Sequence, residues 1–364
     1  MVKHYLQYLN TDDNIIPILL VVFLASIAIS FLTFKPLLLV IIKKKLHDEP
    51  NNRSAHNTVT PTIGGVSIYI SLVLVLCLFG AILRLDGLLI LVGCLTLLFF
   101  LGLNDDLDDL KPFRKAFIQF LVSLFIVAIT DVRILGLSGI LGIGLFPYWF
   151  SVLFTIFVYV LIINAFNLID GVDGLAGSLA VLACVALSFL FWQSKVYALT
   201  ALCFSLTGAL LPFLRLNLSK KRKIFMGDSG SMIIGFTIAY CAISFIYKTQ
   251  LNSVSYFYNN APVMAGAILF YPLLDTLRIF FIRIVLNKTS PFKADRNHIH
   301  HKFLNLGYSH KKTTFTILVL NSIIIAMSYF TRFLDVNIQI FVIIINGLLL
   351  FALPFVIYKM KHNT

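Results

Sequence analysis

The sequence predicts an all-α, polytopic integral membrane protein with about eleven transmembrane helices in a single membrane-embedded domain, residues 1–364. Hydrophobic residues make up 59% of the chain and charged residues only 12%. The mean hydropathy of +0.93 also lies far from that of soluble globular proteins. A span needs about 20 apolar residues. Eleven segments qualify: residues 15–42, 62–83, 86–103, 115–131, 147–163, 174–192, 197–214, 229–247, 261–285, 313–331 and 337–358.

One further apolar stretch, residues 134–146, is excluded from this set because four glycines interrupt it. We expect a re-entrant or interfacial piece there rather than a span. The first segment is too long for the core of a signal peptide and is followed by three lysines, so it is expected to remain as an anchor.

The positions of Lys and Arg predict the orientation, because cytoplasmic loops carry an excess of these residues. Alternate loops and the C-terminal tail hold 20 of the 29 basic residues, and the opposite set holds six. The N-terminus is therefore predicted outside and the C-terminus in the cytoplasm. The main cytoplasmic loops are expected at about 43–61, 104–115, 164–175, 215–227 and 286–312.

The formal net charge of +13 has two explanations. Basic loops beside anionic lipid are ordinary in an inner-membrane protein and account for most of the charge. A surplus of basic residues near acidic loops also suits a polyanionic substrate. Nucleic acid is a poor alternative partner, because no soluble basic domain is present to hold it.

Four polar patches end apolar segments on the predicted cytoplasmic side. They lie at residues 104–109, 164–173, 226–231 and 295–301. Carboxylates cost several kcal/mol in hydrocarbon, so they persist where they face a wet cavity or bind a cation. The pattern predicts an intramembrane enzyme whose cation handles phosphate, with its active site on the cytoplasmic face.

The first patch contains the adjacent pair Asp105 and Asp106. Neighbouring helical residues point about 100° apart, so we expect one carboxylate to bind or orient a ligand and the other to support it. A solvated helix cap is an equally good interpretation of this segment alone. The DDxxD element of prenyl-diphosphate synthases is disfavoured, because those enzymes are soluble bundles.

The second patch repeats a polar residue every three positions, at Asn164, Asn167, Asp170 and Asp173. This spacing aligns side chains along one side of a helix or 3₁₀ turn, and four in register exceed what helix capping requires. Its DGxxG piece resembles CDP-alcohol phosphotransferases, but the Ala-Arg pair and the further aspartates of that family are absent.

The third patch places Asp228 among small residues at the start of an apolar segment. A carboxylate oxygen suits Mg²⁺, and a helix N-terminus suits an anion. Taken alone, a plain N-cap by Asp228 or Ser229 is the simpler interpretation.

The fourth patch combines Arg296 with His298, His300 and His301. A zinc site would need ligands that no cysteine or second histidine cluster supplies. We therefore expect these side chains to donate hydrogen bonds to phosphate oxygens.

With these motifs in hand, the chain resembles the polyprenyl-phosphate N-acetylhexosamine-1-phosphate transferases, and among them the bacterial undecaprenyl-phosphate GlcNAc-1-phosphate branch. Six elements occur in the family's order between about residues 36 and 310. They are D-x-P-N-x-R-x-x-H from residue 48, PTIGG, GLNDDLDDL, NAFNLIDGVDGLAG, Asn217 before FMGDSGS, and ADRNHIHH. One departure is Asn104, where relatives usually carry an apolar residue.

The resemblance implies a reaction of a UDP-N-acetylhexosamine with polyprenyl phosphate that releases UMP and requires Mg²⁺, with Mn²⁺ as an alternative. By resemblance, Asp228 and Asn167 hold the metal, and Asp105 and Asp106 orient or deprotonate the lipid phosphate. Asp170 and Asp173 line the uridine side or support the ligands. The remaining expected substrate-binding and catalytic residues are Lys115, Asn164, Asn217, Arg296, His298, His300, His301, Arg53 and His56. A phosphomonoester has a second pKa near ~6, so direct attack by the lipid phosphate is favoured over a covalent aspartyl intermediate.

Several alternatives stay open. A relative acts on UDP-MurNAc-pentapeptide in peptidoglycan synthesis, and a secondary transporter would also carry polar residues in its spans, although near the midplane. Asp275 and Arg278 inside the ninth segment either meet the lipid phosphate or pair with each other. The sugar, the downstream glycan and the formation of a homodimer are not fixed by the sequence.

Overall fold

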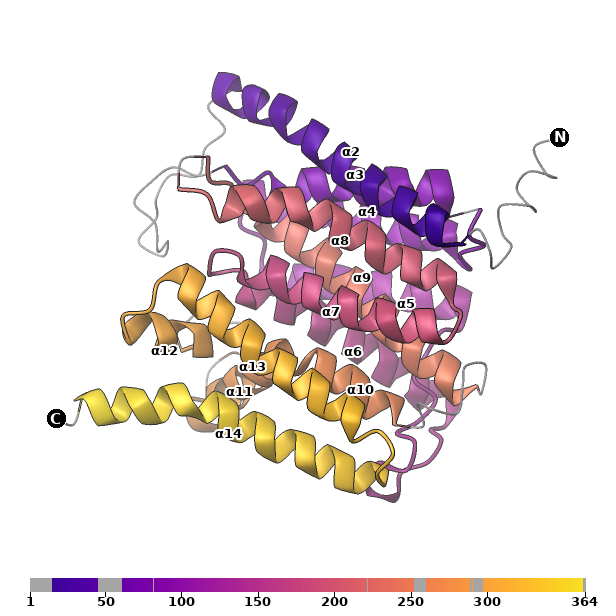
Figure 1. Cartoon of the computed structure of the whole chain (residues 1–364), viewed down its shortest axis with the longest axis vertical. Helices are drawn as coiled ribbons and strands as arrows, with labels where there is room; N and C mark the ends of the chain where they lie inside the picture. The colour runs from indigo at the N-terminus through magenta and orange to yellow at the C-terminus, as the bar shows by residue number, and fades with distance from the viewer. Residues whose placement is uncertain are drawn as a thin grey trace.

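The computed structural model describes residues 15–44, 61–80, 82–220, 222–251, 260–288, 290 and 297–362. Its described part is a helical bundle without strands (Figure 1). Nine helices contain a stretch long and apolar enough to cross a membrane. They are α2 (Ile15–Lys44), α4 (Leu88–Leu107), α5 (Pro112–Thr130), α6 (Tyr148–Ile169), α7 (Leu175–Gln193), α8 (Tyr197–Asn217), α9 (Gly227–Gln250), α13 (His310–Phe330) and α14 (Val336–His362). The prediction of an all-α multi-pass membrane protein is confirmed.

The two other predicted segments are helical but shorter than a continuous span. One is α3 (Gly64–Phe79), with 16 residues. The segment 261–285 is divided into α10 (Ala261–Ile268), α11 (Phe270–Phe281) and a π-helical turn, η4 (Ile282–Leu286). The number of crossings therefore stays a prediction.

The break between α10 and α11 has a local cause. Pro272 has no backbone N–H, so the Ile268 carbonyl loses its helical partner. Asn321 of α13 replaces that partner: its Nδ2 donates to the Ile268 carbonyl at 3.1 Å, and its Oδ1 accepts from the Tyr271 N–H at 3.0 Å. Freed backbone groups need such partners away from water. The break lets α10 pack on α13 and α9 while α11 packs on α6.

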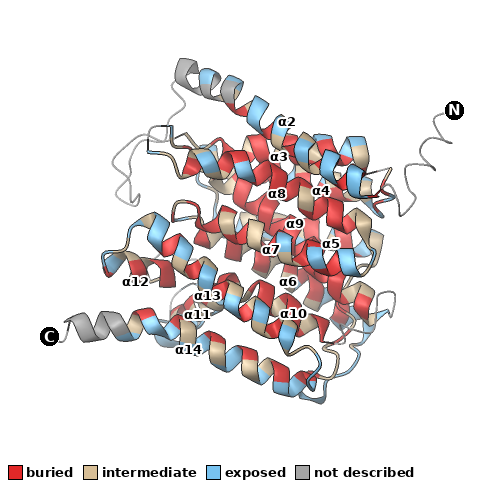
Figure 2. Cartoon of the chain, in the orientation of Figure 1, coloured by how far each residue is buried: buried red, intermediate tan, exposed pale blue. Residues whose placement is uncertain are grey.

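Helix α9 is the centre of the bundle. Its whole spanning window is buried, and it packs against α4, α6 and α3 (Figure 2). Glycines allow the close approach: a Cβ on Gly65 would lie 2.3 Å from the Gly230 nitrogen, and one on Gly102 would lie 2.4 Å from the Ser229 Cα. Small residues at such contacts are typical of membrane helices. The N-terminal turn of α9 is thereby fixed against α3 and α4.

The outer helices present apolar side chains to their surroundings. Figure 2 shows exposed residues along α2 and α14, and Leu32 and Phe341 are among the exposed large apolar side chains. Apolar surface on this scale marks a membrane-facing protein rather than a soluble one.

The start of α2 and the end of α14 lie at opposite ends of the bundle (Figure 1). This arrangement agrees with the odd number of crossings that the sequence predicts. The short helix α12 (Ile299–Asn305), which carries His300 and His301, lies at the end where α14 finishes (Figure 1).

Residues 134–146 form no span. They make a small hairpin with a bridge between Gly136 and Leu145 and a 3₁₀ turn, η2 (Ile140–Gly142). Gln250 at the end of α9 fastens it, accepting from the Leu135 N–H and donating to the Gly136 carbonyl, both at 2.8 Å. The exclusion of this stretch from the spans is confirmed.

Candidate active site

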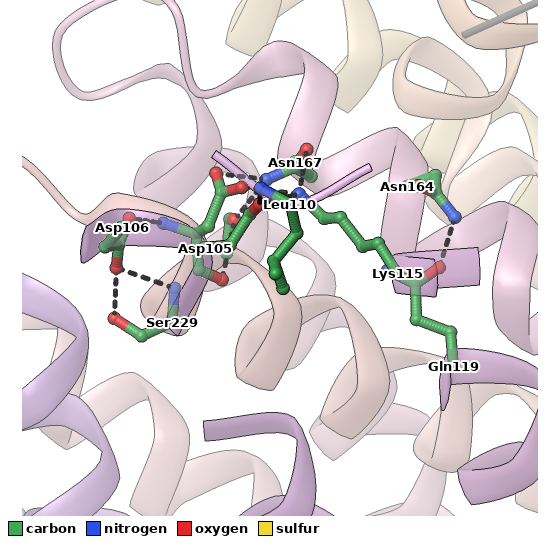
Figure 3. Close-up of polar contacts among 10 residues, drawn as sticks. Asp105, Asp106, Leu110, Lys115, Gln119, Asn164, Asn167 and Ser229 are labelled. Carbon is green, nitrogen blue, oxygen red and sulfur yellow. Dashed lines mark hydrogen bonds and ion pairs between the residues drawn. The ribbon is translucent and has the colours of Figure 1, made fainter. Parts of the chain in front are cut away.

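The adjacent carboxylates at the end of α4 point to different partners (Figure 3). Asp105 accepts a hydrogen bond from the Leu110 N–H at 2.9 Å, and its other oxygen lies 2.6 Å from Nζ of Lys115 on α5. Both ionic side chains are largely buried, with 10% and 13% of their area exposed. Asp105 therefore holds the Lys115 ammonium at the centre of the site.

Asp106 instead joins α4 to the first turn of α9. Its carboxylate accepts from the Asp228 N–H at 2.6 Å, from the Ser229 N–H at 3.1 Å and from the Ser229 hydroxyl at 2.9 Å. The first N–H groups of a helix have no partner within the helix, and a carboxylate is favoured there. Gly227 precedes them with φ +76°, and a Cβ there would lie 2.7 Å from an Asp106 oxygen. Asp106 thus positions Asp228.

Asp228 contacts two other predicted site residues directly. Asn167 of α6 donates to Oδ1 of Asp228 at 2.7 Å and to the Ser231 hydroxyl at 2.9 Å. Lys115 forms an ion pair with the other Asp228 oxygen, and its Nζ lies 3.4 Å from Oδ1 of Asn167. Oxygens from α4, α6 and α9 therefore surround one cationic group, and 33% of the Asp228 side chain remains exposed.

The loop after α6 adds two more carboxylates. Burial, reinforced by the negative charges of Asp228, Asp106 and Asp173, raises the pKa of Asp170 well above its ordinary range. Burial acts in the same direction on Asp173, but hydrogen bonds from His310 and Lys223 outweigh it and lower the Asp173 pKa. Lys223 Nζ lies 2.8 Å and His310 Nδ1 lies 3.3 Å from the Asp173 carboxylate.

The charges at this end suit a divalent cation. Five carboxylates gather there, and the lysines paired with them are Lys115 and Lys223. Burial, together with repulsion from the neighbouring carboxylates, keeps the Asp170 pKa high, and a bound cation would act in the opposite direction. Carboxylate and amide oxygens are the donors that Mg²⁺ prefers. The residues present therefore fit the implied metal.

A buried aspartate of α11 contacts the histidine patch through His298. Asp275 is fully buried, and its carboxylate lies 2.7 Å from Nδ1 of His298 and accepts from the Ile299 N–H at 2.9 Å. Arg278 lies 3.4 Å from the same carboxylate and donates to the Asn297 carbonyl. The Asp275–Arg278 ion pair is thus present, and Asp275 also orients the imidazole of His298.

His300 connects this cluster to the acidic loop. Its Nε2 would lie 3.6 Å from a Cβ on Gly171, between Asp170 and Asp173. Burial lowers the pKa of His300 to about 3, so its ring is neutral at physiological pH. The His301 ring lies 4.4 Å from the His300 ring, measured between centroids.

Asp275, His298 and His300 also have ligand atoms within 4.8 Å of one another, a spacing that a metal site would share. The Arg278 guanidinium already occupies one side of the Asp275 carboxylate. A positive charge there disfavours a second cation, so we assign this trio to positioning rather than to metal binding.

Two predicted substrate-binding residues lie apart from the charged cluster. Asn164 donates to Oε1 of Gln119 at 2.7 Å and joins α6 to α5. Asn217 is buried, accepting from the Gly174 N–H at 2.6 Å and donating to the Ile224 carbonyl at 2.7 Å. Asn217 therefore braces the loop that carries Asp173 and the loop that leads into α9 and Asp228.

Three predicted residues, Arg53, His56 and Arg296, lie outside the described residues. Sequence reasoning did not assign the pairing of Lys223 and His310 with Asp173, nor the contact of Asp275 with His298. A basic residue next to the third patch and a histidine at the start of a span were the available signals.

Carboxylates collected at one end of a membrane bundle are typical of an enzyme rather than of a structural scaffold. Residues 88–246 match the model of glycosyl transferase family 4. A Yersinia pestis undecaprenyl-phosphate alpha-N-acetylglucosaminyl 1-phosphate transferase is 32% identical over 315 residues, covering 85% of this chain and 82% of that protein. The Salmonella typhi protein of the same name is 31% identical over 316 residues, covering 85% and 81%.

A Bacillus subtilis protein described as a probable undecaprenyl-phosphate N-acetylglucosaminyl 1-phosphate transferase is 30% identical over 307 residues, covering 84% of this chain and 83% of its own length. The family match includes the patches at residues 104–109, 164–173 and 226–231. The chain belongs to glycosyl transferase family 4 and is a phosphotransferase enzyme of the membrane.

Proposed function

We propose that the chain transfers N-acetylglucosamine 1-phosphate from UDP-GlcNAc to undecaprenyl phosphate. An oxygen of the lipid phosphate bonds to the phosphorus that carries the sugar, the bond from that phosphorus to the bridging oxygen breaks, and UMP leaves. The contact of Asp105, Asn167 and Asp228 with one ammonium group supports the proposal, because it gathers oxygens from three helices around a single positive charge. The relatives' names supply the sugar and the lipid.

Mg²⁺, or Mn²⁺ in its place, would be held by Asp228 and Asn167, and when bound it supplies charge neutralisation to the donor diphosphate. Asp170 lies near enough to Asp228 for the two charges to interact, so it supports the same cation. Lys115 pairs with the Asp228 oxygen that Asn167 does not contact, and its ammonium group is proposed to bind a phosphate oxygen.

Asp105 is the group proposed to orient the lipid phosphate or to accept its last proton. A phosphomonoester is mostly dianionic at neutral pH because its second pKa is near ~6, so the nucleophile needs orientation more than deprotonation. The Asp106 carboxylate accepts hydrogen bonds from three donors of α9, so it supports the site by holding the first turn of that helix.

The histidines and Arg296 are proposed to bind phosphate oxygens of the donor. The neutral ring of His300 can donate only one N–H. His298 is held in one orientation by Asp275. Arginine binds phosphate in a bidentate manner, so Arg296 is expected to add the strongest contact.

The membrane arrangement belongs to the same proposal. Eleven crossings of the inner membrane place the N-terminus outside and the C-terminus inside, with the acidic end on the cytoplasmic face. The excess of basic residues on that side supports this orientation.

The proposal is tested by release of UMP from purified protein in lipid nanodiscs. Undecaprenyl phosphate is offered with UDP-GlcNAc, UDP-GalNAc or UDP-MurNAc-pentapeptide, each with and without Mg²⁺. We expect release with UDP-GlcNAc only when lipid phosphate and Mg²⁺ are both present. Release with another donor alone would reassign the sugar, and transport of a donor without UMP release would favour the transporter class.

A further inference from the structure

A cavity of about 620 Å³ opens at the end of the bundle opposite the acidic cluster. It lies among the turn before α4, the end of α5, the turn before α8 and the last turns of α9. The candidate active site is built at the other ends of α4 and α9. A ligand in this cavity would therefore be separated from the reaction by the length of a span.

Basic residues concentrate at this cavity. The chain has only six lysines and arginines in the loops and terminus predicted to lie outside. Arg84, Lys195 and Lys248, three of these six, line the cavity, and Asp86 is the acidic residue that lines it. Basic residues are sparse on the outer side of membrane proteins. The collection of three basic residues around one cavity indicates a binding site for an anion.

The floor of the cavity offers hydroxyl groups. Tyr240 and Ser244 of α9 line it and are buried, with 3% and 2% of their area exposed. The Tyr240 hydroxyl donates to the Asp86 carbonyl at 3.2 Å. The Ser244 hydroxyl has no hydrogen bond of normal geometry within the described part of the chain. Buried polar groups are rarely left unsatisfied unless they have a role. A ligand oxygen would satisfy this one.

Two of the basic residues are held in a strained backbone conformation. Arg84 has φ +53° and Lys195 has φ +57°, in the left-handed region that residues other than glycine rarely adopt. Strain of this kind collects at ligand sites and persists where the surroundings impose it. Both strained residues line this cavity, so the two turns are shaped around it.

We propose that this cavity binds a phosphate group, neutralised by Arg84, Lys195 and Lys248 and hydrogen-bonded by the hydroxyl of Ser244. The rest of the lining, including Leu85, Ile129 and Leu199, is apolar. A volume of 620 Å³ also exceeds what a single phosphate ion fills and lies in the range of sites for larger ligands. The headgroup of an anionic phospholipid has this chemistry, and free phosphate shares its charged part.

The experiment compares the wild-type protein with the Arg84→Gln/Lys195→Gln/Lys248→Gln variant and with Arg332→Gln. Arg332 is a basic residue predicted on the same side, and it does not line the cavity. Each protein is extracted from equimolar phosphatidylglycerol and phosphatidylcholine, and retained lipid is counted by native mass spectrometry. A second arm measures the thermal shift caused by inorganic phosphate in phosphatidylcholine alone.

We expect phosphatidylglycerol to be retained by the wild type and by Arg332→Gln, and retention to fall about tenfold or more in the triple variant. A phosphate-induced shift that the triple variant lacks, without lipid retention, would support the same site with a free anion. Equal retention and equal shifts in all three proteins would overturn the proposal. UMP release confirms that the triple variant is folded. Should it fail to fold, Lys248→Gln alone is carried through both arms.

Discussion

Asp105 and Asp106 are neighbours in the chain, yet their carboxylates have different partners. Asp105 pairs with Lys115, whereas Asp106 accepts three hydrogen bonds from the first turn of α9. Adjacent positions on a helix face different directions, so the unequal division was predictable. Which aspartate would support the other helix was not predictable, because the partners of Asp106 lie more than a hundred residues away.

Asp275→Asn is predicted to lower turnover about 10- to 100-fold, as expected for the loss of a group that orients a functional histidine. The asparagine keeps the size of the side chain but loses the charge that holds Nδ1 of His298. The kcat of Asp275→Asn, His298→Gln and the double variant is measured.

Because both residues act through one imidazole, the double variant should lose little more than His298→Gln alone. Fully additive losses would show that Asp275 acts by another route.

A second prediction at this scale concerns acid stability. The pKa of His300 is about 3 in the folded protein against an ordinary 6.5. Below pH 6.5 the unfolded chain binds a proton that the folded chain does not, so the folded state loses stability as pH falls from 6.5 toward 3. The slope is about 1.4 kcal/mol per pH unit.

His300→Gln should flatten the fall in thermal stability between pH 6.5 and 4.5 relative to wild type. Asp173 contributes in the same direction only below about pH 4, where the unfolded chain protonates this carboxyl and the lowered pKa keeps it ionised in the folded protein. An unchanged pH profile in the variant would show that the His300 ring is protonated in the folded protein.

The role of a residue was predictable where the family resemblance assigns it a shared ligand, and less so where its side chain pairs with backbone groups of distant loops. Asn167 and Asp228 were expected to share a ligand, and they touch. Asn217 was expected at the substrate because of its place before the third patch, but its side chain braces two loops. Local spacing does not indicate which backbone groups a distant loop leaves unpaired.

At the scale of helices, the start of α9 controls the site. Gly227→Ala should destabilise the protein by at least about 1–2 kcal/mol, because a left-handed φ disfavours any Cβ and this Cβ would meet the Asp106 carboxylate. Thermal denaturation in micelles and UMP release are both measured, and both should fall.

The matched control is Gly266→Ala in α10, where a Cβ would meet nothing within 4 Å. It should leave activity unchanged and hold or raise stability, since alanine favours a helix over glycine. Equal losses of stability and activity in Gly227→Ala and Gly266→Ala would contradict the special role of the first turn of α9.

Helix positions followed the apolar segments closely, because a span must be long, apolar and internally hydrogen-bonded. The break in the ninth segment has its local cause in Pro272, a residue that the sequence shows. Its repair by Asn321 was not predictable, since that residue lies in the middle of an apolar helix and its partners are set by packing. Contacts between helices are the part that a single sequence leaves open.

At the scale of the whole molecule, the two ends of the bundle differ in charge. Carboxylates and histidines gather at one end, and three basic residues surround a cavity at the other. The proposed orientation predicts that Ser219→Cys reacts with a membrane-impermeant maleimide only in inside-out vesicles, and Leu251→Cys only in intact cells. Cys77, the exposed native cysteine, is first replaced by alanine. Labelling in the reverse pattern would invert the topology.

The central claim is that Asn167 of α6 and Asp228 of α9 together bind one divalent cation beside the carboxylates of α4. Mn²⁺ binding followed by electron paramagnetic resonance tests this claim most directly. The account predicts one Mn²⁺ per chain, displaced by Mg²⁺. It predicts that Asp228→Asn loses this binding, while Asp131→Asn at the opposite end retains it. Mn²⁺ bound with equal affinity by the wild type and Asp228→Asn would contradict the account.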